Sequence, residues 1–118
     1  MGWVGVWKNQ YGSTLTVADD ADGKIVGTFR TALRDSGFHG KEIAVSGIHL
    51  GDCINFAFAA ATESGDLLCS FSGLLRDGRI ETVWHVLADG RREEDGRMTK
   101  RNWPHAVMTN ADTFTRVE

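Results

Sequence analysis

The chain has 118 residues, of which 42% are hydrophobic and 25% charged, a composition typical of a folded globular protein rather than a disordered one. Its length predicts a single domain spanning residues 1–118. The formal net charge is −3, and basic residues are interleaved with acidic ones, so no electrostatic field would attract a nucleic acid. We therefore predict no nucleic-acid partner.

Apolar and polar residues alternate along most of the chain, and this period of two predicts short β-strands. Turn-forming Gly, Asp and Ser residues separate them, as in "ADDADG", "TESGD" and "RDG". A first strand begins at Gly5. Seven more strands are predicted, in chain order, at residues 13–17, 24–32, 42–49, 53–61, 67–75, 79–88 and 106–117.

Eight strands in this order, most of them joined by short hairpins, predict an all-β fold. An eight-stranded antiparallel up-and-down β-barrel is favoured because closure leaves no strand edge exposed. A two-sheet sandwich is the alternative. The charged segment at residues 91–101 contains Gly96 and has no apolar face, so it is predicted to be a loop.

Other features of the sequence bear on the cellular compartment of the protein, on disulfide formation and on metal binding. The most apolar run, residues 53–61, is too short to cross a bilayer as a helix, and we expect no membrane partner. No basic segment followed by an apolar core begins the chain, which predicts a cytoplasmic protein or a secreted one whose leader has been removed. Cys53 and Cys69 fall on opposite strand faces and are predicted to be free thiols. No histidines show metal-ligand spacing, so no metal is expected.

Strand alternation also predicts which side chains point into the barrel. Most of them are apolar and are expected to form an ordinary core. Four inward residues are polar: Asn9, Ser13, Thr31 and Asp112. Because buried polar groups need hydrogen-bond partners, we interpret them as a polar head that converges on a ligand. Capping of turns at the barrel rim is the alternative.

The segments "GVWKNQYGSTLTV", "DGKIVGTFRTA", "SFSG", "IETVW" and "ADTFTRV" resemble the streptavidin and avidin family in order and approximate spacing. The resemblance covers nearly the whole chain. It implies an eight-stranded barrel that holds biotin non-covalently at its open end, with no cofactor, and that pairs into homodimers or homotetramers.

The resemblance also implies roles for single residues. Asn9 and Ser13 match the residues that donate to the biotin ureido oxygen, whereas Asp112 and Thr31 match the acceptors for its two N–H groups. Trp84 matches a pocket wall. The ligand-binding set predicted from the resemblance and the inward face is Asn9, Ser13, Phe29, Thr31, Phe56, Phe58, Ala60, Leu67, Cys69, Phe71, Trp84, Trp103 and Asp112, in which Trp103 matches a Trp lent by a neighbouring subunit.

Five positions depart from the family pattern. Phe29 stands where the family has a Tyr that also donates to the ureido oxygen. Ala60 and Phe71 replace two pocket Trp residues, and Leu67 and Cys69 replace the Ser and Thr that bind the biotin tail and sulfur. We therefore expect biotin, or a biotin-like cyclic urea, to bind more weakly than it does to streptavidin.

A second interpretation stays open at this point. The remodelled, more apolar pocket could take a different ligand, and the barrel could be a biosynthetic enzyme of the cyclase or isomerase type with Asp112 as general base. No feature of the sequence requires catalysis, so a binding protein is preferred. Val83, His85 and Leu87 form an outward stripe that suits a symmetric interface, which favours a homo-oligomer.

Overall fold

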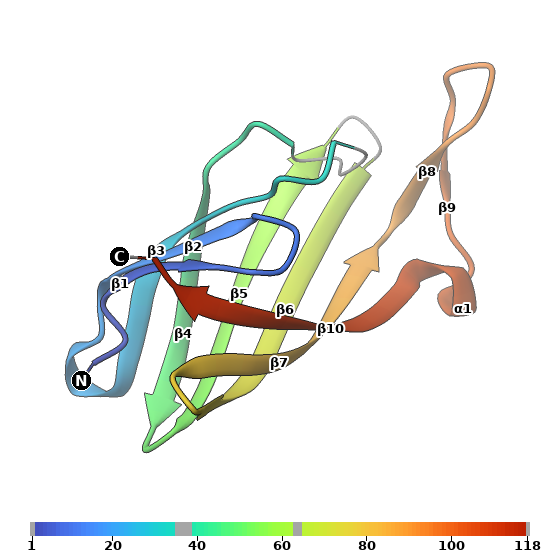
Figure 1. The fold of residues 1–118 in the computed structure, drawn as a ribbon. Helices are drawn as coiled ribbons and strands as arrows, with labels where there is room; N and C mark the ends of the chain where they lie inside the picture. The colour runs from blue at the N-terminus through green and yellow to red at the C-terminus, as the bar shows by residue number, and fades with distance from the viewer. Residues whose placement is uncertain (1, 35–38, 63–64, 118) are drawn as a thin grey trace.

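The computed structural model describes residues 2–34, 39–62 and 65–117, which form a closed barrel with an extended arm (Figure 1). Neighbouring strands pair antiparallel in the order β1-β10-β7-β6-β5-β4-β3-β2. This confirms the eight-stranded barrel and excludes the two-sheet sandwich. The barrel strands are β1 Gly5–Lys8, β2 Thr14–Asp19, β3 Lys24–Arg30, β4 Ile43–Leu50, β5 Cys53–Thr62, β6 Gly65–Arg76, β7 Arg79–Ala88 and β10 Val107–Arg116.

The observed strands follow the predicted ones closely because the alternating pattern sets both their position and their inward face. β7 coincides with the prediction, whereas β3 ends at Arg30, two positions before the predicted end at residue 32. A short 3-10 helix, η1 (Ala21–Gly23), occupies the predicted turn between β2 and β3. Residues 63–64, at the tip of the predicted turn between β5 and β6, lie outside the described residues.

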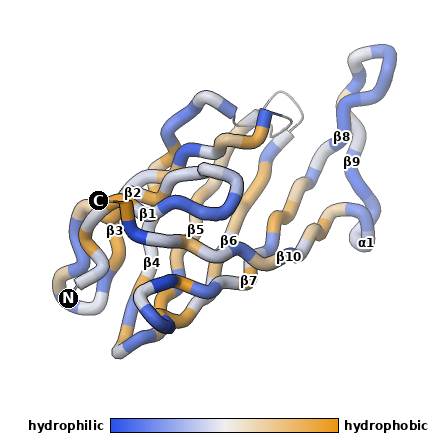
Figure 2. The backbone as a smooth tube through the Cα atoms, in the orientation of Figure 1, coloured by the Kyte–Doolittle hydropathy of each residue, from blue (hydrophilic) through white to orange (hydrophobic). Residues whose placement is uncertain are grey.

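The prediction of a loop at residues 91–101 is wrong. These residues belong to a two-stranded hairpin, β8 (Gly90–Arg92) and β9 (Met98–Lys100), that projects from the barrel (Figure 1). Gly96 adopts a φ of 86° and closes the turn, and backbone N–H groups of Glu93 and Gly96 complete it. Figure 2 shows the arm as mostly hydrophilic, which explains why no apolar alternation marked it.

A single turn of helix, α1 (Trp103–Ala106), joins the arm to β10. Asn102 precedes it in an extended conformation and Pro104 lies in its first turn, where the missing N–H has no helical partner to lose. Within the described ranges, no helix is long and apolar enough to cross a membrane.

Aromatic rings fill the barrel interior. Phe56 stacks on Phe71 with ring centroids 4.7 Å apart, and Phe114 meets both rings edge-on. At the end of the barrel near the N-terminus, the indole N–H of Trp7 donates to the Trp3 carbonyl. These contacts close one end of the barrel and leave the other end to form a cavity. Cys53 is exposed and Cys69 buried, and both are free, as predicted.

Replacing Phe56 by Ala should lower the free energy of unfolding by about 3–5 kcal/mol, because the ring is fully buried and its loss leaves a void. Urea unfolding followed by Trp fluorescence measures the change. Tyr11→Ala removes another aromatic ring, which is 55% exposed, and should change the stability by less than about 1 kcal/mol. Equal effects of the two substitutions would contradict the proposed core.

Candidate functional site

A cavity of about 420 Å³ opens at the end of the barrel where the β1–β2 turn and the starts of β6 and β10 lie. Its volume falls in the range of small-molecule sites. Most of the predicted ligand-binding residues line it: Asn9, Ser13, Phe29, Thr31, Phe58, Leu67, Cys69, Phe71, Trp84 and Asp112. The barrel thus brings together residues separated by as many as 103 positions in the chain.

Asn9 lies in the turn between β1 and β2, whose backbone fixes its side chain. Its Oδ1 atom accepts from the backbone N–H of Ser13 at 2.9 Å and of Tyr11 at 3.0 Å. Both lone pairs of the amide oxygen are therefore used, and the orientation of the amide is fixed. Nδ2 donates to Asp112 Oδ2 at 3.0 Å, and its second hydrogen has no partner among the described residues.

Ser13 and Thr31 are buried next to each other on the same side of the cavity. The Ser13 hydroxyl accepts from the backbone N–H of Ala32 at 2.9 Å, and the Thr31 hydroxyl accepts from that of Leu33 at 3.2 Å. The two hydroxyl oxygens are 3.5 Å apart. Since backbone donors already use one acceptor position on each hydroxyl, at least one hydroxyl hydrogen remains for a ligand.

Asp112, on β10, is buried and accepts on both carboxylate oxygens. Gln10 Nε2 donates to its Oδ1 at 3.0 Å, while Asn9 occupies Oδ2. Gln10 in turn accepts from the backbone N–H of Thr113 at 3.0 Å, and Thr82 donates to the Asp112 carbonyl. Gln10 was not among the predicted residues, because an exposed polar residue in a turn carries no sequence signal of such a role.

The side walls of the cavity are apolar and aromatic. Phe29 and Phe58 stack at 5.0 Å, and the Phe71 and Trp84 rings lie 6.4 Å apart. The Trp84 indole nitrogen is buried and has no hydrogen-bond partner within the described part of the chain. An unpaired buried donor is costly, so a ligand acceptor that reached it would gain from the contact.

Three predicted site residues lie elsewhere. Phe56 is fully buried beneath the cavity, in the aromatic core. Ala60 is half-buried on β5 but does not line the cavity. Trp103 is 71% exposed on α1, outside the cavity of its own chain. Their roles toward a ligand remain predictions.

Cys69 is a potential nucleophile in the wall of the cavity. Burial, and secondarily the negative charge of Asp112, raises the pKa of Cys69 from 9.0 to about 12. The thiol is therefore protonated at neutral pH and behaves as a small apolar side chain. Among the described residues, no three His, Cys, Asp or Glu side chains are grouped so that they could hold a metal ion.

Solved structures share this architecture. The bradavidin2–biotin complex matches with a TM-score of 0.76 at 20% identity, covering all of both chains. Apo shwanavidin matches with a TM-score of 0.80 at 23% identity, covering all of this chain and 98% of the other. The rhizavidin–biotin complex matches with a TM-score of 0.74 at 18% identity, over 100% of this chain and 98% of the other.

The sequence itself was compared with models of known families. The model that describes the avidin family matches residues 2–117, which confirms the resemblance seen in the sequence motifs. This chain belongs to the avidin family.

Proposed function

We propose that the protein binds biotin, or a biotin-like cyclic urea, non-covalently in the open end of the barrel. The observation that carries this proposal is the polar head, defined by Asn9, Ser13, Thr31 and Asp112, set against an otherwise apolar cavity. Membership of the avidin family supports the proposal, as do the biotin complexes of bradavidin2 and rhizavidin, which have the same fold.

The chemistry of a cyclic urea is complementary to this head. A urea is planar and presents one acceptor oxygen between two N–H donors. The second Nδ2 hydrogen of Asn9 and the hydroxyl hydrogen of Ser13 are available for the oxygen. The carboxylate of Asp112 and the hydroxyl oxygen of Thr31 can accept from the N–H groups. A hydrogen bond to an ionised acceptor is roughly twice as strong as one between neutral groups.

The affinity should be lower than in family members that carry a Tyr at the position of Phe29. Phe29 lines the cavity but has no hydroxyl to donate to the urea oxygen. The missing hydrogen bond should weaken binding by about 1–3 kcal/mol, or roughly 5- to 150-fold in affinity. Leu67 and Cys69 likewise provide apolar surface where the family has hydroxyl groups.

The protonated thiol of Cys69 and the hydrogen-bonded carboxylate of Asp112 favour a binding function over catalysis. The Cys69 thiol is protonated at neutral pH because its pKa is raised to about 12. Both carboxylate oxygens of Asp112 accept from side-chain amides, which fix the group as a hydrogen-bond acceptor. No cofactor is needed for this function, in which biotin is the ligand.

Biotin added in thousandfold excess over its Kd should raise the free energy of unfolding by about 4 kcal/mol, because it binds only the folded state. Thermal melting and isothermal titration calorimetry measure the effect. Desthiobiotin, which keeps the cyclic urea but lacks the sulfur ring, should also bind. The absence of any shift at millimolar biotin and desthiobiotin would contradict the proposed function.

Asp112→Asn should weaken biotin binding roughly 10- to 100-fold, since it removes a charged acceptor and sets an amide group against the amide donors of Asn9 and Gln10. The binding is measured by calorimetry on protein whose far-UV spectrum shows it to be folded. Asp77→Asn makes the same acid-to-amide change in the exposed turn between β6 and β7 and should leave the affinity unaltered. Unchanged binding by Asp112→Asn would remove Asp112 from the polar head.

The outer face of strands β4 to β7 supports assembly with a second copy of the chain. It exposes Ile48, Leu50, Leu74 and Val83, and a shallow, mostly apolar hollow of about 610 Å³ lies between them. Contiguous apolar surface of this kind is typical of interaction sites. An interface between identical faces also fits the predicted homodimer or homotetramer, in which the exposed Trp103 is available to a neighbouring subunit.

We expect size-exclusion chromatography with light scattering to give the mass of a dimer or tetramer for the parent chain. Leu74→Lys with Val83→Lys should shift it to the monomer, because two charges would be buried at the interface. Val26→Lys is the control, since Val26 is exposed to a similar degree, 49% against 52% for Val83, but lies on β3. A monomeric parent, or equal effects of both variants, would contradict this interface.

A further inference from the structure

Arg101 lines the mouth of the cavity, directly after β9 at the base of the projecting arm. Its backbone N–H donates to the Asp89 carbonyl at 2.9 Å, and its side-chain Nε donates to the Gly90 carbonyl at 2.7 Å. Two anchors to the same short segment hold the half-buried side chain against the barrel end of the hairpin. The cation is therefore positioned at the opening of the cavity rather than extended into solvent.

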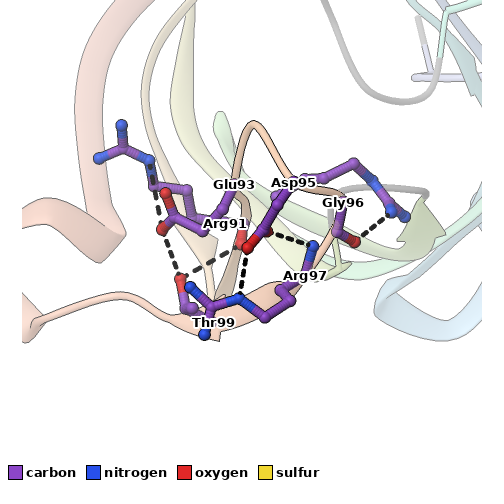
Figure 3. Close-up of polar contacts among 7 residues, drawn as sticks. Arg91, Glu93, Asp95, Gly96, Arg97 and Thr99 are labelled. Atoms are coloured by element: carbon purple, nitrogen blue, oxygen red, sulfur yellow. Dashed lines mark hydrogen bonds and ion pairs between the residues drawn. The ribbon is translucent and has the colours of Figure 1, made fainter.

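Other cations of the arm have partners nearby, and Figure 3 shows those of Arg91 and Arg97. Arg91 pairs with Glu93 at 3.9 Å and Arg97 with Asp95 at 2.7 Å, while Lys100 pairs with Asp89. Arg101 differs from them. No carboxylate of the described residues lies within ion-pair distance of its guanidinium, and its two terminal nitrogens have no hydrogen-bond partner there.

The cavity thus has opposite polarity at its two ends. The polar head carries the Asp112 carboxylate, and the mouth carries the Arg101 guanidinium. Between them lie the apolar walls that include Phe71, Trp84 and Val86. A ligand that matches this arrangement has N–H donors at one end, an apolar middle and an anionic group at the other end.

We propose that Arg101 recognises a carboxylate on the tail of the bound ligand, so that the pocket selects an anionic tail over a neutral one. This assignment rests on the proposed function and extends it from the cyclic urea to the far end of the ligand. With Nε held by Gly90, the two terminal nitrogens present parallel donors, the geometry that suits a planar carboxylate.

One acidic residue opposes this preference. Asp66 lines the same mouth and is exposed, and Lys100 lies close enough to interact with it electrostatically. Its negative charge repels a carboxylate, but solvent screens an exposed charge more than it screens the half-buried guanidinium. Removing the charge of Asp66 should therefore strengthen binding of an anionic ligand, the opposite of removing the charge of Arg101.

The test compares biotin with biotinamide, which has the same ring system and a neutral tail. Calorimetry at low and at physiological ionic strength gives the affinity of each ligand for the parent, Arg101→Gln and Asp66→Asn. We expect the parent to prefer biotin, Arg101→Gln to weaken biotin about tenfold with biotinamide unchanged, and Asp66→Asn to strengthen biotin alone. The preference should shrink as salt is added.

Arg97→Gln is the matched control, because it removes a cation from the same arm at a position outside the cavity. It should leave both affinities as they are. If Arg101→Gln affected biotin and biotinamide equally, or neither, the tail assignment would be wrong while the proposed function would stand. Failure of the parent to bind either ligand would overturn the proposed function and the tail assignment together.

Discussion

The hydrogen bonds around Asp112 both close the barrel and shape its polar head. β1 has only four residues, and its register with β10 pairs Trp7 with Arg116 and Lys8 with Thr115. Beyond Lys8, side-chain hydrogen bonds take the place of the pairing between β1 and β10, since Asn9 and Gln10 both donate to Asp112. Gln10 also accepts from the backbone of Thr113, as a strand partner would. The first turn is thereby fastened to the middle of the last strand.

This shared use limits what can vary in the pocket. A buried carboxylate is stable only where donors compensate its charge, and here the two amide donors come from the turn that also positions Ser13. On the side walls, Phe71 is placed instead by ring contacts with Phe56 and Trp84. A substitution at Leu67, Cys69 or Phe71 would therefore leave these hydrogen bonds in place, whereas one at Asp112 would break them.

The sequence was sufficient for the barrel and for most of the cavity because both follow from strand alternation. Once the strands are placed, inward positions such as Phe71 and Asp112 follow from the period of two. The arm could not be predicted in this way. It is held by a glycine turn and charge pairs, such as Arg97 with Asp95, and it buries no apolar face that would appear as a pattern.

Two other residues escaped prediction because their roles depend on contacts that the chain makes only after folding. Gln10 acts through Asp112, 102 positions away. Arg101 is placed by Gly90, eleven positions away across a hairpin that was predicted to be a loop. A polar residue on a turn or an arm gives no periodic signal, so its partner has to be seen in space.

The opposite charges at the two ends of the cavity bear on how a ligand orients as well as on which ligand binds. A carboxylate that entered first would meet Asp112 in a low-dielectric environment, where repulsion between like charges is strong. The same carboxylate at the mouth would meet the Arg101 guanidinium, with solvent still available to it. A molecule with a urea at one end and a carboxylate at the other is therefore favoured in one orientation only, before any contact with the apolar walls is considered.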